Sequence, residues 1–125
     1  MCYNLNMLNK QLTKNFKLSE LACPCCWAFD MPEWMLEKIQ AVRDEFGFNM
    51  TINSGYRCKD HNVKVGGSST SRHLIGLAID VKINQNQLRK KILEAAERHG
   101  VCGIGIAKTF IHLDWDTTRK SCWIY

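Results

Sequence analysis

Hydrophobic residues recur at helical spacing in the first half of the chain. They follow one another at intervals of three or four residues, at Met35, Ile39, Val42 and Phe46. Pro32 stands where a first helical residue is expected, and Gly47 follows the pattern as a stop signal. The pattern therefore predicts a helix over about residues 32–46.

A second long helix is predicted in the later part of the chain. One face of this segment carries, at helical spacing, Leu88, Ile92, Ala95 and His99. Asn84 or Asn86 can cap its start through a side-chain oxygen. Gly100 is the residue type that commonly follows the last turn, so we expect the helix to end there.

Short apolar segments between turn residues predict the strands. They cover residues 50–53 (ending at Ser54-Gly55), 77–83 (with Asp80 inside), 103–106 and 110–115. The last two are joined by Ala107-Lys108-Thr109 and form a hairpin. The Gly- and Ser-rich residues 66–71 lack the lysine of a phosphate-binding loop, so we interpret them as a lip beside a site.

These elements predict an α+β fold in which two main helices pack on a small, mostly antiparallel sheet. The 125 residues fit one domain. We assign residues 16–125 to this domain. Residues 1–15 are more polar, and we expect an N-terminal arm that is extended or forms a short helix.

Charge and hydropathy narrow the classes of partner. The net charge of +5 is too small to indicate nucleic-acid binding, and we expect no nucleic-acid partner. It suits an anionic polymer such as a bacterial wall, although lysines kept for solubility explain it equally well. No window of about 18 apolar residues predicts a transmembrane helix, and the first residues do not resemble a secretory signal. We expect a monomer.

The seven cysteines leave at least one thiol unpaired in a monomer. Cys23, Cys25, Cys26 and Cys58 have the residue types of a second metal site, a zinc knuckle. Their spacing lacks the usual pair of C-x-x-C motifs, and free thiols that are buried or half-buried are the simpler interpretation. Without a secretory signal we expect reduced thiols rather than a disulfide framework.

Asp80 stands out because it lies in an apolar strand between Ile79 and Val81. A carboxylate in such a place costs several kcal/mol unless it is paired or binds a cation. His73 precedes it by seven residues, across Gly76, which permits a tight turn. A loop histidine and a strand carboxylate can then converge on one point.

His112 is the second unusual residue. On a strand, residues 112, 114 and 116 share one face, which carries His112, Asp114 and Asp116. Residues 111, 113 and 115 then face the core. Two histidines and one carboxylate around an open position form a catalytic zinc arrangement, so the sequence predicts a zinc site.

The sequence also resembles a known family. The motif S-x-H-x-x-G-x-A-x-D over residues 71–80, followed by H-x-D at 112–114, is similar to the signature of the zinc D-Ala-D-Ala carboxypeptidases and their relatives. Those relatives include phage endolysin peptidases, vancomycin-resistance dipeptidases and the hedgehog domain. Further similar segments are residues 15–21 with Cys23, residues 52–57, Asn62 with Gly66-Gly67, and the aromatic tail Trp123 and Tyr125.

The resemblance implies roles for individual residues. His73, Asp80 and His112 match the metal ligands of the family. Arg57 matches an arginine that holds the scissile carbonyl or the tetrahedral intermediate, and a fixed cation there would stabilise an oxyanion. Ser71 matches a substrate-contacting serine. A surface arginine after a turn and a loop serine in a local turn are the structural alternatives for Arg57 and Ser71.

The general base is where this sequence departs from its relatives. Several of them place a carboxylate three residues before the last ligand, but here that position is Thr109. We predict that Asp114 replaces it, because Asp114 shares a strand face with His112. The alternative is that Asp114 orients His112 as a metal ligand. Asp116 is expected to be solvated or to face the substrate.

The resemblance implies zinc-dependent hydrolysis of an amide bond in the stem peptide or cross-link of peptidoglycan, as in the D-Ala-D-Ala carboxypeptidases. Alternative activities are those of an L-Ala-D-Glu or DD-endopeptidase of a phage lysis system. A zinc-binding module for wall recognition without catalysis is a further alternative, which Thr109 favours. We expect a phage or prophage protein that is cytoplasmic until it is released to the cell wall.

Overall fold

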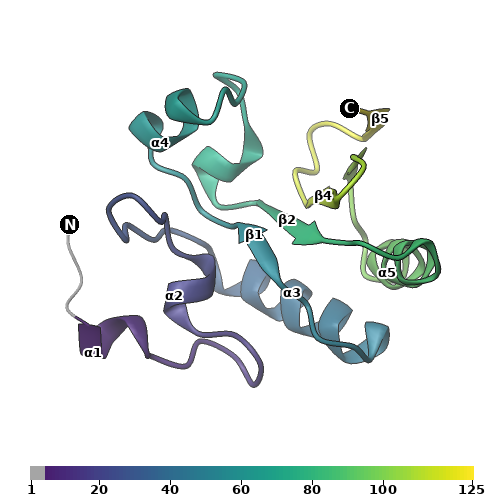
Figure 1. Ribbon diagram of the computed structural model, residues 1–125, viewed down its shortest axis with the longest axis horizontal. Helices are drawn as coiled ribbons and strands as arrows, with labels where there is room; N and C mark the ends of the chain where they lie inside the picture. Colours follow the sequence, from purple (N-terminus) through teal and green to yellow (C-terminus); the bar gives the residue numbers. More distant parts are fainter. Residues whose placement is uncertain (1–4) are drawn as a thin grey trace.

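The computed structural model describes residues 5–125, and a five-stranded sheet runs through its centre (Figure 1). The strands are β1 (Ile52–Ser54), β2 (Ala78–Lys82), β3 (Gly103–Ile106), β4 (Phe110–Asp114) and β5 (Ser121–Ile124). Their order in the sheet is β1-β2-β4-β3-β5. Only the β3–β5 pair is parallel, so the predicted α+β fold with a mostly antiparallel sheet is confirmed.

Two long helices, α3 (Glu33–Phe46) and α5 (Asn86–Arg98), lie on the same side of the sheet (Figure 1). The short helices are α1 (Leu5–Leu8), α2 (Leu18–Leu21), α4 (Lys59–Lys64) and the 3-10 helix η1 (Arg72–Ile75). In Figure 1, α4 lies on the opposite side of the sheet from α3. The two long helices are the ones that the hydrophobic spacing predicts.

Strand periodicity separates the core from the polar face. Buried side chains of β2 and β4 join those of the long helices in one core cluster, with Ile79, Val81, Ile111 and Leu113 from the strands. Met35, Ile39 and Val42 of α3 belong to the same cluster. Because side chains alternate along a strand, Asp80 and His112 point away from the long helices.

Three details differ from the predicted elements. Pro32 is not the first helical residue but the N-cap of α3, with the extended backbone angles φ −64° and ψ 151°. Helix α5 starts after Gln85, so neither Asn84 nor Asn86 is its N-cap. Strand β5 is absent from the prediction, because its pairing partner β3 is distant in sequence and its residues show no apolar alternation.

The N-terminal segment touches the domain through a few contacts. Leu8 at the end of α1 is buried, and a bridge pairs Gln11 with Lys17. Thr13 Oγ1 donates to Gln40 Oε1 of α3 at 2.6 Å. Phe16, just after the predicted arm, is 1% exposed and belongs to the core cluster.

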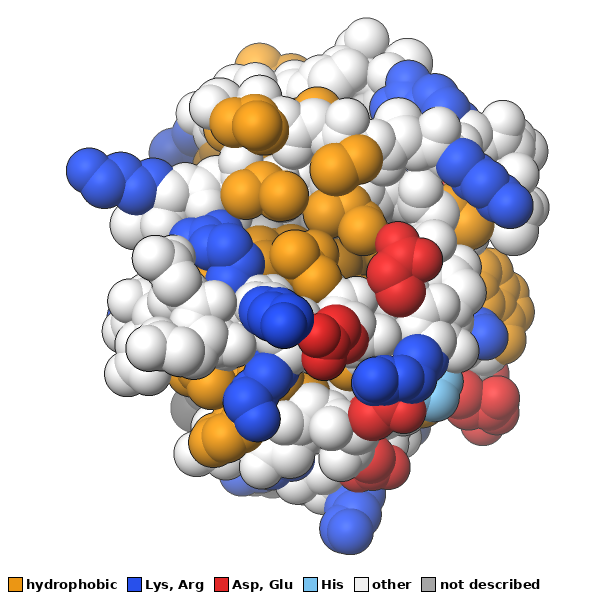
Figure 2. Space-filling view, turned by 90° about the vertical axis from the view of Figure 1, so that its right-hand side faces the viewer, with side chains coloured by type: hydrophobic (Ala, Val, Ile, Leu, Met, Phe, Trp, Pro, Cys, Tyr) orange, Lys and Arg blue, Asp and Glu red, His pale blue; other side chains and the backbone are white. Residues whose placement is uncertain are grey.

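Figure 2 views the right-hand side of Figure 1, where α5 lies. Basic and acidic side chains are interspersed there around exposed hydrophobic groups. Lys90 and Glu94 form an i,i+4 ion pair of 3.9 Å on α5, and Arg98 reaches Glu45 of α3 at 3.0 Å. No helix within residues 5–125 combines the length and the apolar character that crossing a membrane requires.

Candidate metal centre

Two polar residues on neighbouring strands stand opposite each other at the centre of the polar face of the sheet. In the antiparallel register, Asp80 of β2 stands directly opposite His112 of β4. Residues opposite each other on neighbouring strands project to the same face with their Cβ atoms about 5 Å apart. The register of β2 and β4 therefore brings together two polar side chains that are 32 residues apart in sequence.

His73 reaches the same point from η1. Ser71 caps this helix, since its Oγ accepts the backbone N–H of His73 at 3.3 Å. The helix ends at Gly76 in the left-handed conformation, with φ +72°, and a Cβ there would overlap the Asp30 carbonyl. The chain can turn into β2 at this place because Gly76 has no side chain, as its position in the sequence predicts.

Three acceptor atoms converge at this centre. His73 Nε2 and His112 Nδ1 each lie 3.1 Å from Asp80 Oδ1. The outer ring nitrogens are occupied: His73 Nδ1 lies 2.7 Å from the Gly55 carbonyl, and His112 Nε2 lies 2.8 Å from Asp114 Oδ2. Because a carbonyl or a carboxylate only accepts, the outer nitrogens carry the protons and the inner ones direct lone pairs at Asp80.

This arrangement fits a zinc ion. One nitrogen each from His73 and His112 and one oxygen of Asp80 lie within 4.8 Å of one another, and all three residues are buried. Tetrahedral zinc with ligand bonds of about 2.1 Å separates its ligand atoms by about 3.4 Å, close to the spacing found here. Two neutral imidazoles and a carboxylate need either extra protons or a cation between them, and zinc satisfies all three donors.

The electrostatics of the centre follow from burial and close partners. Burial would raise the pKa of Asp80, but hydrogen bonds to His112 and His73 outweigh it and hold that pKa well below its usual range. Burial alone would lower the pKa of His112, and the carboxylates of Asp114 and Asp80 raise it above its ordinary 6.5. The carboxylate is therefore ionised near neutral pH, as metal binding requires.

Asp114 lies behind His112, on the side away from Asp80. Its Oδ2 is the partner of His112 Nε2, and its Oδ1 accepts the backbone N–H of Asp116 at 3.3 Å. It is 3% exposed and does not line the cavity described below. Both carboxylate oxygens are thus engaged within the protein, as expected of a group that orients a ligand histidine.

Asp116 differs from the expectation that it is solvated or faces the substrate. Its side chain is buried, and its Oδ2 accepts a hydrogen bond from Arg72 Nε at 2.9 Å. Its Oδ1 accepts from the backbone and hydroxyl of Thr118. It fixes the turn after β4 rather than the centre, because strand β4 ends at Asp114 and the alternation stops there.

Arg57 holds the other oxygen of Asp80. Its Nη2 donates to Asp80 Oδ2 at 3.1 Å, its Nε to Ser54 Oγ at 2.8 Å and its Nη1 to Asn62 Oδ1 at 3.2 Å. The guanidinium therefore leaves Asp80 Oδ1 for the metal. It also borders the cavity, so one side of it faces a bound molecule.

A cavity of about 400 Å³ opens above the three convergent donors. It is lined by the donors themselves, by residues of the 65–72 segment, by Arg57 and Arg119, and by the aromatic residues Phe110, Trp123 and Tyr125. Ser71 is part of this lining as well as the cap of η1. Thr109 is exposed in the β3–β4 turn and is not part of it.

Two glycines and a tryptophan complete the centre, and sequence reasoning assigned them no such role. Trp123 of β5 packs on His112, with ring centroids 5.0 Å apart, and it can do so because a Cβ on Gly105 would overlap its indole. A Cβ on Gly103 would overlap the Asp114 carboxylate. Each glycine stands opposite the residue it accommodates, a relation that only the strand register reveals.

Comparison with known proteins agrees with this centre. The sequence model of the peptidase M15 family matches residues 14–114, which include His73, Asp80 and His112. The chain belongs to the peptidase M15 family. A zinc D-Ala-D-Ala carboxypeptidase of Streptomyces albus G is 39% identical over 64 residues, which make up 50% of this chain and 25% of that protein.

Membership of the M15 family agrees with the predicted class, a zinc metallopeptidase, and the buried His-Asp-His group fits zinc as the cofactor. The chain covers only a quarter of the length of the Streptomyces protein. The family match ends at Asp114, so β5, with Trp123, lies beyond the matched segment.

Proposed function

We propose that this M15 peptidase hydrolyses an amide bond in the stem peptide of bacterial peptidoglycan, with an activity like that of a D-Ala-D-Ala carboxypeptidase. The observation that carries the proposal is the convergence of His73, Asp80 and His112 at the floor of a cavity bordered by arginines. The name of the Streptomyces relative supports the choice of substrate.

His73, Asp80 and His112 would hold the zinc ion through one atom each. A zinc ion with an open position polarises a carbonyl oxygen and lowers the pKa of a bound water to about 7. The protein supplies the positioning. The Gly55 carbonyl fixes the ring of His73, and Arg57 fixes Asp80, so the donors are oriented before a substrate arrives.

We assign the orienting role to Asp114, rather than that of proton acceptor. Its carboxylate is buried behind His112, and both oxygens already accept hydrogen bonds. Besides Asp80, no Asp or Glu residue within residues 5–125 lines the cavity. We therefore assign no Asp or Glu side chain as the general base. Thr109 does not take this role, because it is exposed and does not line the cavity.

The charge of the cavity supports cleavage next to a free carboxylate. Arg57 and Arg72 are paired with Asp80 and Asp116, whereas Arg119 has no ion pair within the part of the chain that the structure describes. Arg119 is therefore the cation available to bind the terminal carboxylate of a stem peptide. An endopeptidase substrate has no such carboxylate at the scissile bond, so this feature favours the carboxypeptidase.

Digestion of defined stem peptides tests the proposal. Zinc-loaded protein should release D-Ala from a pentapeptide ending in D-Ala-D-Ala, as detected by mass spectrometry, and should release little from the same peptide with an amidated C-terminus. Arg119→Gln should raise KM about tenfold or more, since a charged hydrogen bond contributes roughly 1.5–3 kcal/mol. The exposed Lys108→Gln is a control that removes a charge outside the cavity.

Other results would point to the alternatives. Equal cleavage of the amidated peptide, or release of fragments cut at L-Ala-D-Glu or between cross-linked stems in whole peptidoglycan, would favour an endopeptidase. Zinc-loaded protein that binds the wall without cutting it would favour a recognition module. Origin in a phage or prophage, with release from the cytoplasm to the wall, stays a prediction.

A further inference from the structure

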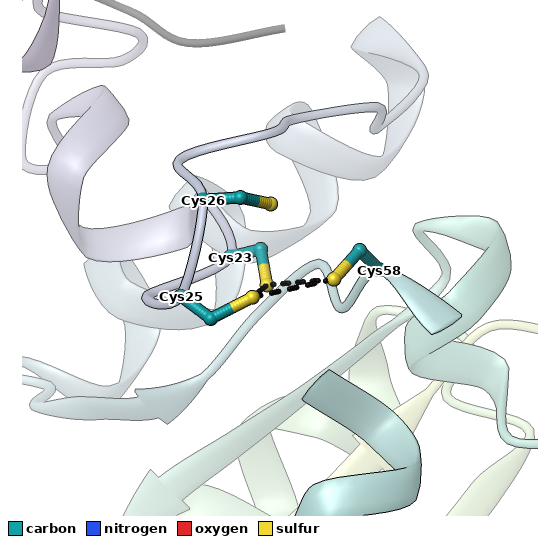
Figure 3. Close-up of side chains that lie close together, drawn as sticks. All are labelled: Cys23, Cys25, Cys26 and Cys58. Carbon is teal, nitrogen blue, oxygen red and sulfur yellow. Dashed lines mark hydrogen bonds between the residues drawn. The ribbon is translucent and has the colours of Figure 1, made fainter. Parts of the chain in front are cut away.

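Four cysteine side chains meet at a second place, away from the zinc centre (Figure 3). Cys23 follows α2, Cys25 and Cys26 lie in the loop after it, and Cys58 precedes α4. Although 32 residues separate Cys26 from Cys58, the fold places their thiols within 4.8 Å. None of the four is in a disulfide.

The spacing of the sulfur atoms is that of a metal site. Cys23 Sγ lies 3.5 Å from Cys25 Sγ and 3.6 Å from Cys58 Sγ, and Cys25 Sγ lies 3.4 Å from Cys58 Sγ. All four ligand atoms lie within 4.8 Å of one another. Four thiolates around zinc, with Zn–S bonds of about 2.3 Å, are separated by about 3.8 Å. A small inward shift of Cys26 would complete this geometry.

Hydrophobic burial does not explain why these thiols meet. Only Cys23 is buried, while Cys26 and Cys58 are half-buried and Cys25 is exposed. Free cysteines usually behave as small apolar residues and enter the core singly. Three mutually touching thiols that are partly open to solvent need another reason to stay together.

The loop around the thiols is tightly folded. Cys23 N–H donates to the Ala28 carbonyl at 2.8 Å, and Trp27 N–H donates to the Cys23 carbonyl at 2.7 Å. Trp27 adopts the left-handed conformation, with φ +61°, which a residue with a bulky side chain rarely does. The loop thus holds an unfavourable backbone conformation directly beside Cys25 and Cys26.

Cys58 is also fixed by the backbone. Its Sγ accepts the backbone N–H of His61 at 3.4 Å, so a negatively charged sulfur at this position has a hydrogen-bond donor beside it. Thiolates, not thiols, bind metal ions. A set of four sulfur donors in tetrahedral spacing suits zinc better than it suits magnesium, calcium or manganese, which prefer oxygen.

We propose that Cys23, Cys25, Cys26 and Cys58 bind a second zinc ion, which has a structural role. Its four protein ligands leave no position for water, so this ion would take no part in hydrolysis. It would join the loop after α2 to the segment before α4. The sequence left this site open beside the free-thiol interpretation, because the irregular C-x-C-C spacing does not show that Cys58 comes close.

The zinc ion at the cysteines would stabilise the segment that positions the ligands of the zinc ion at the His-Asp-His centre. Tyr56 N–H donates to the Leu21 carbonyl at 2.8 Å, so residues 55–58 run beside the end of α2. The same segment provides the Gly55 carbonyl to His73 and the guanidinium of Arg57 to Asp80. A tetrathiolate zinc at Cys58 therefore holds in place two partners of the zinc ligands.

Metal content tests the proposal independently of activity. Protein prepared under reducing conditions with zinc should contain about two zinc ions per chain by elemental analysis, and His73→Ala should retain about one. Cys58→Ser and Cys25→Ser should also retain about one, while Cys122→Ser, which removes an exposed thiol elsewhere, should keep both. One zinc in the native chain and none in His73→Ala would overturn the second site.

Cobalt substitution identifies the ligands by spectroscopy. In His73→Ala, bound Co²⁺ should show strong thiolate-to-metal charge transfer in the near ultraviolet, which a site of histidines and a carboxylate does not give. Absence of this band, or full intensity retained in Cys26→Ser, would overturn the four-thiolate assignment. Cleavage of stem peptides by the wild-type protein is a separate readout, because it depends on the zinc ion at the His-Asp-His centre. If the cobalt band is absent but the wild type cleaves the peptides, the second site is wrong and the proposed function stands.

Discussion

The His-Asp-His centre and the four-cysteine group differ in what holds their donor atoms in place. At the centre, every ligand has a second partner: Gly55 for His73, Arg57 for Asp80 and Asp114 for His112. In the cysteine group, the sulfur atoms contact mainly one another, and the backbone contributes hydrogen bonds only at Cys58 and Cys26. The first group is pre-organised without a metal, whereas the second depends on one.

This difference separates two uses of zinc. A pre-organised centre keeps its geometry while a metal-bound molecule changes, which suits chemistry. A group that needs the metal to stay assembled converts binding energy into folding energy, which suits a structural role. Substitutions at the first group should therefore affect zinc affinity and rate, while those at the second should affect local stability.

The largest effect is expected for Asp80→Ala. Loss of this ligand should reduce peptide hydrolysis to background and remove one zinc, while the cysteine group keeps its own. It also leaves Arg57 without its carboxylate in a mostly buried position, which typically costs about 3 kcal/mol of unfolding free energy. Elemental analysis and denaturant unfolding measure the two effects. Retention of both zinc ions would show that Asp80 is not a ligand.

Asp114→Asn comes next. If Asp114 orients His112, the substitution should weaken zinc binding about 10–100-fold, and excess zinc should restore the rate. If Asp114 is the proton acceptor, kcat should fall about 10²–10⁴-fold with zinc still bound. Asp116→Asn is the matched control, since Asp116 pairs with Arg72 instead of a ligand histidine, and it should leave zinc affinity unchanged.

The pH dependence of the centre follows from His112. In the metal-free protein, the pKa of His112 is raised above its ordinary value of 6.5. The proton on His112 therefore stabilises the folded state fully below pH 6.5. This stabilisation is lost as the pH rises through the raised pKa. Zinc needs the neutral ring, so zinc affinity should rise over the same range, by up to about tenfold per pH unit. The Tm difference between zinc-loaded and metal-free protein should then increase with pH. In Cys58→Ser, which isolates the centre, a difference independent of pH would contradict this.

The smallest effect is expected for Ser71→Ala. Loss of the cap on η1 typically costs about 1 kcal/mol of stability, because the His73 N–H loses its partner. Kinetics on the stem peptide sharpen the role of this residue. An increase in KM beyond that of Thr70→Ala, a neighbour that also lines the cavity, would support direct substrate contact.

Residues whose role depends on local periodicity were predictable from the sequence. Helix α3 follows from its apolar spacing, and the strand alternation that buries Ile111 and Leu113 turns His112 and Asp114 to the other face. The tight turn at Gly76 also follows from residue type. These features depend on neighbours within a few positions, which a single sequence displays directly.

Features that depend on pairing between distant segments were not predictable. The sequence does not show that Gly105 stands between His112 and Trp123, because this relation needs the register of three strands. The sequence also does not decide whether Asp114 accepts a proton or orients His112. These two roles are distinguished only by the position of its carboxylate behind His112. The closeness of Cys58 to Cys23 has the same origin, because two loops must first be packed together.

The position of β5 has a practical consequence for preparing this protein. Tyr125 lines the cavity, and in Figure 1 the C-terminus lies on the other side of the molecule from α1, the first helix that the structure describes. A polyhistidine tag added after Tyr125 would therefore place several imidazoles next to the metal centre, where they compete for zinc and for the space of the substrate. A tag at the opposite end avoids this artefact in metal analysis and in kinetics.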